Sequence, residues 1–244
     1  MNLILDFGNT QKKIALFDQG RMVHTEARAE ITTSDLEAFG NAHPGITRCI
    51  LSSVTDHSPD IEPFLRSRYF FIPMNETTPV PLINLYRTPN TLGRDRLAAA
   101  VGGAAEFPGR NLLVICAGTA LTFDFVSSGG EYLGGSIAPG MQMRFRALHT
   151  FTDRLPLISY TEETSLIGAD TAGSILSGVV NGMTAEMEGM AGRYAEQFPG
   201  LVVILGGGDL NYFFKRLKIS IFARPNIVIH GLQQILELNA HPSH

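Results

Sequence analysis

Short apolar runs separated by polar turns dominate the first seventy residues of the chain. The runs at 3–7, 13–17 and 21–26, with turn residues between them, predict three strands joined as a meander. A polar segment at 33–41 has helical character, and beyond it the pattern predicts a strand at 48–54, a helix at about 59–68 and a strand at 69–72. A meander followed by alternating helices and strands predicts a mixed sheet with helices packed on it.

The second half of the chain repeats this order. A proline-containing stretch at 73–90 predicts a long loop, and an alanine-rich helix at 93–106 ends at Pro108-Gly109. Beyond it the pattern predicts strands at 112–115, 121–126, 132–137, 201–205 and 226–229, and helices at 139–148, 168–198, 210–217 and 231–238. We therefore predict a duplicated α/β protein with one domain at 1–106 and a second at 107–244.

Composition narrows the class of protein. Of 244 residues, 44% are hydrophobic and 17% charged, which is typical of a compact globular chain. The net charge of −4, without any run of Lys or Arg, predicts no nucleic-acid partner. No apolar stretch approaches the ~20 residues that span a bilayer, so we expect no membrane partner. Two cysteines, Cys49 and Cys116, are too few for a disulfide scaffold, and we expect a cytoplasmic protein.

A short motif occurs twice, each time directly after an apolar strand. Asp6-Phe7-Gly8-Asn9-Thr10 follows the first strand, and Cys116-Ala117-Gly118-Thr119-Ala120 follows the first strand of the second half. Glycine lets the backbone approach a ligand closely, while consecutive amides and a Thr hydroxyl can cradle phosphate oxygens. Two such turns predict a nucleotide held between two similar halves, and Asp6 is suited to the metal ion that accompanies the phosphates.

Each turn taken alone also fits an ordinary hairpin, because short glycine motifs recur by chance. A third cluster, Gly206-Gly207-Gly208-Asp209, follows a strand and opens a helix, although it also fits a plain strand-to-helix turn. The three clusters together favour the nucleotide interpretation.

Gly93-Arg94-Asp95-Arg96 opens the alanine-rich helix beside the long loop. Asp95 in a first helical turn fits a simple cap as well as a catalytic carboxylate. Two flanking arginines keep such a carboxylate ionised, and Arg96 can bind an anionic acceptor through its planar guanidinium. Phosphoryl transfer needs little more than a carboxylate near the acceptor hydroxyl, a metal on the phosphates and a positioned acceptor.

Taken in order, these motifs resemble the type III pantothenate kinases. The resemblance covers nearly the whole chain and is carried by Asp6-x-Gly8-Asn9-Thr10, Tyr86, Pro89, Gly93-x-Asp95-Arg96, Gly118-Thr119-Ala120-x-Thr122-x-Asp124, Gly134-Gly135-x-Ile137-x-Pro139-Gly140, Thr152-x-x-Leu155-Pro156, Gly168-x-x-Thr171, Ile175-x-x-Gly178 and Gly231-Leu232. It implies the fold of the acetate-kinase, sugar-kinase, Hsp70 and actin superfamily: two ribonuclease-H-like domains with ATP between them. It also implies a homodimer that phosphorylates pantothenate to 4'-phosphopantothenate, the first step of coenzyme A biosynthesis.

The resemblance also implies a role for each matching residue. Contacts to ATP and its Mg²⁺ are implied for Asp6, Phe7, Gly8, Asn9, Thr10, Gln11, Lys12 and Lys13, with Asp6 toward the metal and Thr119 toward phosphate. Pantothenate binding is implied for Tyr86, Gly93, Arg94, Asp95 and Arg96, with Asp95 as general base and Thr171 completing the pocket across the dimer interface.

Two positions depart from the family pattern. The second phosphate motif of the family opens with an Asp that helps bind K⁺ or NH₄⁺, whereas this chain has Cys116. A thiol is neutral at pH 7 and has little affinity for K⁺, so we predict weak dependence on K⁺ unless other oxygens supply the site. The third cluster, usually Thr-Gly-Gly, is Gly206-Gly207-Gly208, which loses a hydroxyl but keeps the backbone shape.

The favoured interpretation is an ATP-dependent pantothenate kinase. The alternative is a regulatory or binding member of the same family with little or no turnover, and Cys116 is the feature that keeps it open. A sugar kinase of the same superfamily would require a polar hexose-binding loop, which we do not find.

Overall fold

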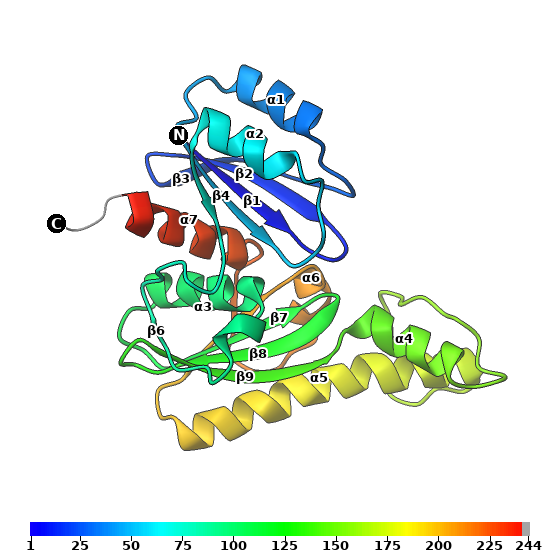
Figure 1. The fold of residues 1–244 in the computed structure, drawn as a ribbon. Coiled ribbons are helices and arrows are strands. Elements are labelled where there is room, and N and C mark those ends of the chain that lie inside the picture. The colour runs from blue at the N-terminus through cyan, green and yellow to red at the C-terminus, as the bar shows by residue number, and fades with distance from the viewer. Residues whose placement is uncertain (241–244) are drawn as a thin grey trace. The chain divides into compact units, whose positions relative to one another are not determined.

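The computed structural model describes residues 1–240 and divides into two compact units, each described here by itself (Figure 1). The first unit comprises Met1–Pro108, Gly130–Tyr132 and the segment from Asn226 onward, and the second comprises Gly109–Gly129 and Leu133–Pro225. The predicted domains, 1–106 and 107–244, assigned the C-terminal segment to the second half. In the structure this segment packs with the first unit, and the last four residues of the predicted domain lie outside the described residues.

The first unit is built on a five-stranded mixed sheet with the order β3-β2-β1-β4-β5. Its elements are β1 (Asn2–Phe7), β2 (Lys12–Asp18), β3 (Arg21–Arg28), α1 (Thr33–Ala42), β4 (Arg48–Ser53), α2 (Ile61–Arg68), β5 (Phe70–Pro73), β6 (Ile83–Asn84), η1 (Pro89–Thr91), α3 (Arg94–Glu106) and α7 (Ile227–Ala240). β1 pairs with β2 in antiparallel and with β4 in parallel orientation.

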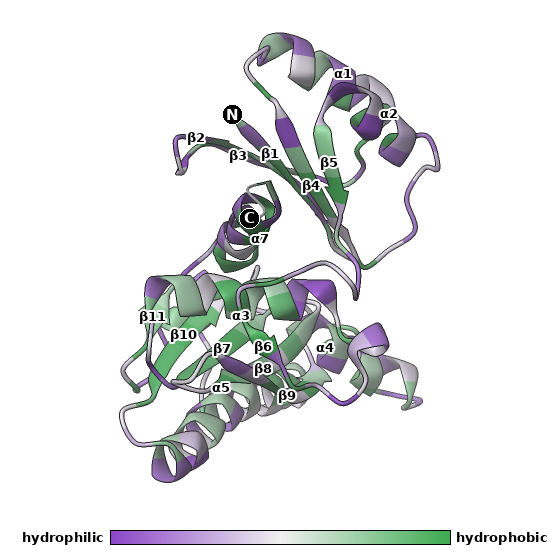
Figure 2. Ribbon diagram, turned by 60° about the vertical axis from the view of Figure 1, so that its left-hand side comes forward, coloured by the Kyte–Doolittle hydropathy of each residue, from purple (hydrophilic) through white to green (hydrophobic). Residues whose placement is uncertain are grey.

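Alternation along β1 gives this sheet two different faces. Leu3, Leu5 and Phe7 join the apolar core formed with α1 and α2, which cover one face of the sheet (Figures 1 and 2). Successive side chains on a strand point to opposite faces, so Asn2, Ile4 and Asp6 point the other way. On that face α7 is tied to the start of β1, because the Asn2 side-chain amide donates to Gln233 Oε1 at 3.2 Å and to Glu237 Oε1 at 2.6 Å.

The predicted strand at 226–229 is wrong, because Ile227–Ala240 forms the single helix α7. Its β-branched start, Ile227-Val228-Ile229, favours a strand locally, but burial against α3 decides for the helix. Gly231 and Gly102 let these helices pack closely: a Cβ on Gly231 would lie 1.7 Å from the Ala98 carbonyl oxygen.

The second unit carries most of a six-stranded sheet with the order β11-β10-β7-β8-β9-β6. Its elements are β7 (Leu112–Ala117), β8 (Ala120–Val126), β9 (Glu131–Pro139), α4 (Met141–Thr150), α5 (Thr171–Gln197), β10 (Val202–Gly206), α6 (Leu210–Phe214) and β11 (Phe222–Ala223). The short strand β6 pairs with Glu131 and Tyr132, the part of β9 that belongs to the first unit. Neither β6 nor β11 was predicted.

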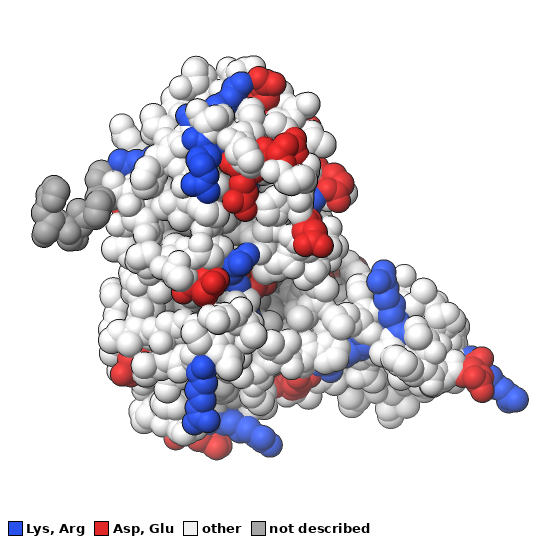
Figure 3. All heavy atoms as spheres, in the orientation of Figure 1, with Lys and Arg blue, Asp and Glu red and all other residues white. Residues whose placement is uncertain are grey.

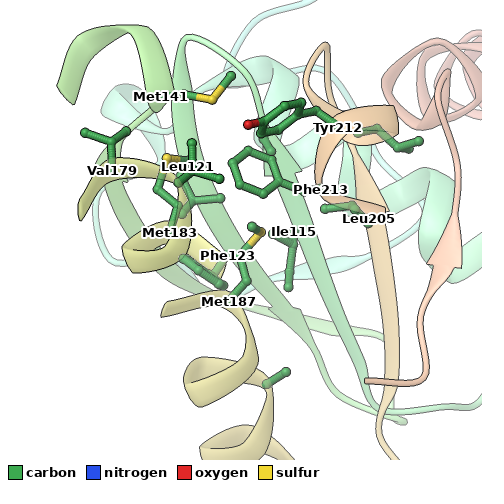
Figure 4. Packing of buried hydrophobic residues seen from close by; sticks show 14 of the residues in the cluster. Ile115, Leu121, Phe123, Met141, Val179, Met183, Met187, Leu205, Tyr212 and Phe213 are labelled. Atoms are coloured by element: carbon green, nitrogen blue, oxygen red, sulfur yellow. The ribbon is translucent and has the colours of Figure 1, made fainter. Parts of the chain in front are cut away.

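Methionines of α5 fill the core of the second unit. Met183 and Met187 are fully buried and point toward Phe123 on β8, as Figure 4 shows. Phe213 of α6 lies in the same cluster. The unbranched thioether side chain suits such irregular gaps between a helix and a sheet.

The two sheets share one topology, which confirms the predicted duplicated α/β fold. In each unit the first strand lies between an antiparallel partner that follows it along the chain and a parallel partner from later in the chain: β1 between β2 and β4, β7 between β8 and β10. In each unit the third strand of the meander lies beyond the second.

No helix within residues 1–240 is long and apolar enough to cross a membrane. Acidic and basic side chains are interspersed on the face of the molecule seen in Figure 3.

Candidate active site

The turn between β1 and β2 is a tight loop that presents three polar residues to solvent. The Gly8 amide donates to the Gln11 carbonyl oxygen at 3.0 Å, and a Cβ on Gly8 would lie 3.2 Å from that oxygen. Asn9, Thr10 and Gln11 are exposed. The predicted phosphate-binding turn therefore has its polar groups accessible, as a cradle for an anion requires.

Lys12 and Lys13, both assigned to ATP by resemblance, lie on opposite faces of β2. The strand register pairs Lys13 with Asp6 and Lys12 with Phe7. Lys12 is buried, forms an ion pair with Glu30 and lies 5.4 Å from the centroid of the Phe7 ring. Lys13 is half-buried on the face of Asp6. The structure thus brings Lys13, and not Lys12, to the acidic group of the turn.

Two carboxylates from distant parts of the sequence interact on this face. Burial and, after it, the negative charge of Asp95 together raise the pKa of Asp6 to about 7, while Lys13 opposes both. The unfavourable placement of Asp6 is the kind that a bound cation would relieve, because a positive charge favours the ionised carboxylate.

Asp95 is held at the start of α3 by its local backbone. Its Oδ1 accepts a hydrogen bond from the Arg96 amide at 2.9 Å. A Cβ on Gly93, the N-cap residue, would lie 2.7 Å from this same oxygen and would displace the Asp95 carboxylate. Arg94 points elsewhere and donates from Nη1 to the Ser53 carbonyl oxygen at 2.8 Å. This bond ties the start of α3 to the loop that follows β4.

A cavity of about 610 Å³ lies where these segments of the first unit meet. It is lined by the phosphate turn, the loop after β4 and the start of α3, through Asn9, Ser53, Val54, Thr55, Asp56, Asn90, Thr91, Leu92, Gly93 and Arg94. The lining residues at 53–56, 90 and 91 belong to none of the motifs identified in the sequence. Residues 53–56 could have been found from the sequence, because they lie at the carboxyl end of a predicted strand, where ligands of α/β sheets commonly bind.

Tyr86 and Arg96, both predicted to bind the acceptor, lie together. The Arg96 guanidinium carbon is 5.8 Å from the centroid of the Tyr86 ring, and Arg96 is only 6% exposed. The Tyr86 ring also lies 6.1 Å from that of Tyr132. Thr171, the remaining predicted acceptor residue, is exposed at the first position of α5 in the second unit.

Three glycine motifs of the second unit converge at the turn between β7 and β8. The Gly118 amide donates to the Ala120 carbonyl oxygen at 3.0 Å, and the Gly140 amide donates to the Thr119 carbonyl oxygen at 3.2 Å. Gly207 has a positive φ of 93°, and a Cβ there would lie 2.2 Å from the Ala117 carbonyl oxygen. The third glycine cluster is therefore packed against the second turn, whose Thr119 is exposed.

The residues present fit a divalent cation in the first unit better than a potassium ion at Cys116. Within residues 1–240 no group of three or more His, Cys, Asp or Glu side chains is placed to hold a metal. Asp6 offers a carboxylate of the kind that commonly holds Mg²⁺ together with the phosphates of a nucleotide. Cys116 is half-buried and in no disulfide, and it supplies a soft thiol instead of the oxygen that K⁺ prefers.

Comparison with solved structures defines the fold class. The chain superposes on a conserved Campylobacter jejuni protein assigned to the Baf family of transcriptional activators, with a TM-score of 0.63 and 19% identity over 98% of both chains. It also superposes on a Sinorhizobium meliloti protein assigned as a 2-dehydro-3-deoxygalactonokinase, with a TM-score of 0.60 and 14% identity over 100% of both chains. A glucokinase from an Antarctic psychrotroph gives a TM-score of 0.52 at 12% identity, with 97% of this chain and 98% of that chain covered. The fold is the two-domain α/β fold of sugar kinases, as predicted.

Sequence comparison identifies the family. The family model for type III pantothenate kinase matches residues 2–193. Type III pantothenate kinases from Christiangramia forsetii and Phocaeicola vulgatus are 40% and 42% identical to this chain, which covers 99% of each while they cover 98% of it. The chain belongs to the type III pantothenate kinase family.

Proposed function

We propose that this protein phosphorylates the primary hydroxyl of pantothenate with ATP, giving 4'-phosphopantothenate and ADP. The observation that carries the proposal is the meeting of two predicted motifs on one face of the first sheet: Asp95 at the start of α3 lies close enough to Asp6 of the phosphate turn to raise its pKa. The choice of pantothenate and ATP as substrates rests on membership of the type III pantothenate kinase family.

In the proposed mechanism Asp95 accepts the proton of the pantothenate hydroxyl as its oxygen attacks the γ-phosphorus of ATP and the bond to ADP breaks. A positioned general base typically accelerates such a step by about 10²–10⁴-fold. The cation on the phosphates, for which we propose Mg²⁺, neutralises their charge when bound, and Asp6 would hold it. The amides and side chains of Asn9 and Thr10 bind phosphate oxygens, and Gly8 lets the backbone come close to them.

The acceptor pocket in this proposal contains Tyr86 and Gly93–Arg96. Arg96 binds the carboxylate of pantothenate, because its planar guanidinium matches a carboxylate with two parallel hydrogen bonds. The contact of Arg96 with the Tyr86 ring fixes the guanidinium for this task. Arg94 contributes by holding the Ser53 loop beside the pocket.

We further propose a homodimer, with Thr171 completing the pocket of the partner. A Cβ on Gly178, Gly182, Gly189 or Gly192 of α5 would have no neighbour within 4 Å. Open glycines in a helix cost about 1 kcal/mol each relative to Ala, a needless loss on a face that only contacts water. Leu166 and Ile167, shortly before this helix in the chain, and Phe151, at the C-terminal end of α4, are more than 79% exposed. Sedimentation as a monomer at micromolar concentration would contradict the dimer.

The monovalent cation is the part of the family pattern that this chain alters. We propose that turnover depends only weakly on K⁺ or NH₄⁺, because Cys116 replaces the anionic oxygen ligand by a neutral thiol. Thr119 remains the proposed phosphate contact of the second turn. We place the enzyme in the cytoplasm, where a reducing milieu suits cysteines that form no disulfide within residues 1–240.

The decisive experiment measures ADP release with pantothenate as acceptor, with and without K⁺ or NH₄⁺, and identifies the product by mass. We expect pantothenate-dependent turnover with formation of 4'-phosphopantothenate. Binding of ATP and pantothenate without turnover under every salt condition would instead favour a regulatory member of the family, the alternative that Cys116 keeps open.

A further inference from the structure

Ser52, near the end of β4, has a buried hydroxyl that nothing in the described part of the chain satisfies. The residue is 0% exposed, and its Oγ has no hydrogen-bond partner within residues 1–240. The next residue provides a contrast, because the Ser53 hydroxyl donates to the Thr55 carbonyl oxygen at 2.6 Å. Leaving a buried hydroxyl unpaired is unfavourable, so such a group calls for an explanation.

The strand register places Ser52 beside Asp6. β1 and β4 run parallel, and Ser52 is the residue paired with Asp6. Their neighbours Leu5 and Leu51 both belong to the core on the α1 and α2 side of the sheet. Because successive side chains alternate between faces, Ser52 and Asp6 share the opposite face. Lys13, which pairs with Asp6 from the other side, completes a row of three polar side chains across β2, β1 and β4.

We propose that Ser52 belongs to the cation site: its Oγ accepts a hydrogen bond from a water molecule in the shell of the divalent cation that Asp6 holds. This proposal rests on the proposed function in one respect, which is that Asp6 marks the cation site of the kinase. Mg²⁺ gives up its water reluctantly and usually keeps several waters when bound by one or two carboxylates. Those waters need acceptors, and Ser52 supplies one on the right face of the sheet.

A purely structural role predicts the opposite behaviour for this residue. Removing an unpaired buried hydroxyl relieves its desolvation and leaves only a small void, so Ser52→Ala would keep or raise stability. A partner of a metal's shell, in contrast, loses metal affinity on mutation, typically by about 10–100-fold. The two roles are therefore separated by measuring metal binding and stability on the same variant.

The test titrates Mn²⁺ against the protein in the presence of ADP, with free Mn²⁺ followed by electron paramagnetic resonance. We expect Ser52→Ala to weaken Mn²⁺ binding about tenfold without lowering the melting temperature. Ser52→Thr, which keeps the hydroxyl, should bind close to wild type. Ser67→Ala is the matched control, because Ser67 is exposed on α2 and its hydroxyl donates to the Phe64 carbonyl oxygen at 2.7 Å. Ser52→Cys, of nearly equal volume and without the hydroxyl, replaces Ser52→Ala if that variant does not fold.

Wild-type Mn²⁺ affinity in Ser52→Ala and Ser52→Cys would overturn the proposal. So would an unchanged Mn²⁺ affinity with a raised KM for pantothenate, which would assign the hydroxyl to the acceptor. The binding readout needs no pantothenate. A wild-type protein that fails to phosphorylate pantothenate would therefore sink the proposed function, while the Mn²⁺ comparison would still decide the role of Ser52.

Discussion

The two turns that follow β1 and β7 occupy the same place in two copies of one topology but carry different chemistry. In the first unit Asp6 lies in register with Lys13 on one side and Ser52 on the other. In the second unit the corresponding row is Cys116, Thr122 and Gly206. One row carries a negative and a positive charge, whereas the other is neutral.

The backbone of each turn is held by a main-chain hydrogen bond from its glycine, which reaches the third residue on in the first turn and the second residue on in the other. Gly8 and Gly118 each donate an amide hydrogen bond within their own turn, both at 3.0 Å. These main-chain hydrogen bonds hold the backbone of each turn. Because they do not involve the side chains at the strand ends, those side chains can differ between the two units. The row at the strand ends is therefore acidic in the first unit, where the charge of Asp95 also acts on Asp6, and neutral in the second.

The largest effect is expected when the proposed base, Asp95, is removed. We expect Asp95→Asn to keep the fold and to lower kcat by at least ~10²-fold, because the amide cannot accept the hydroxyl proton. Asp18→Asn, at the exposed last residue of β2, is the control. Steady-state kinetics and a melting curve measure both variants, and near wild-type turnover in Asp95→Asn would remove this residue from the mechanism.

The charged row can be tested with a matched pair of neighbouring lysines. We expect Lys13→Met to lower kcat/KM for MgATP by about 10–150-fold, equivalent to one charge-assisted hydrogen bond of ~1.5–3 kcal/mol. Lys12→Met should change it little, because Lys12 faces Phe7 and Glu30 on the other side of the sheet. An equal loss of kcat/KM for MgATP in Lys13→Met and Lys12→Met would contradict the idea that only the lysine on the face of Asp6 acts on ATP.

The neutral row can be made more like the charged one. Cys116→Asp introduces an oxygen ligand beside Thr122 and Gly206, and we expect it to create or strengthen activation by K⁺ by several-fold. The measurement is turnover against K⁺ at constant ionic strength, with Na⁺ or choline as balancing cation. Strong saturable activation of the native protein that stays unchanged in Cys116→Asp would contradict the idea.

The smallest expected effect concerns stability and pH. The pKa of Asp6 is about 7 in the folded protein against an ordinary value of 3.8. The folded state thus binds this proton more tightly than the unfolded state, so it loses stability as pH rises between these values and stays penalised above them. Asp6→Asn removes the penalty. Without ligands, we expect its melting temperature to exceed that of wild type by a few degrees at pH 8, where 1 kcal/mol corresponds to about 2–4 °C.

Calorimetry at pH 8 and at pH 4 checks this expectation. The difference between Asp6→Asn and wild type should disappear at the lower pH, where Asp6 is protonated in the folded protein. The stabilised variant should also lose the rise in melting temperature that MgATP gives to wild type, because ligand binding to the folded state is what raises it. A variant less stable than wild type at pH 8 would contradict the electrostatic account.

The sequence alone predicted most helices and strands, because their apolar spacing is local. The repeated turns, and Asp95 at the start of α3, could be read in the same way. The pattern failed where local preference and burial disagree. Ile227-Val228-Ile229 favours a strand, yet α3 offers a surface that a helix covers better, and close contact at Gly102 and Gly231 allows it.

Only the tertiary structure separated Lys12 from Lys13 and brought Ser52 to Asp6. A sequence motif does not distinguish two neighbours such as Lys12 and Lys13. A pleated strand, in contrast, places their side chains on opposite faces of the sheet. Residues 46 positions apart, such as Asp6 and Ser52, become neighbours only through strand pairing, and no local pattern encodes that register. The sequence therefore determined which elements and chemical groups this protein has, and the pairing of its strands decided which of those groups share a site.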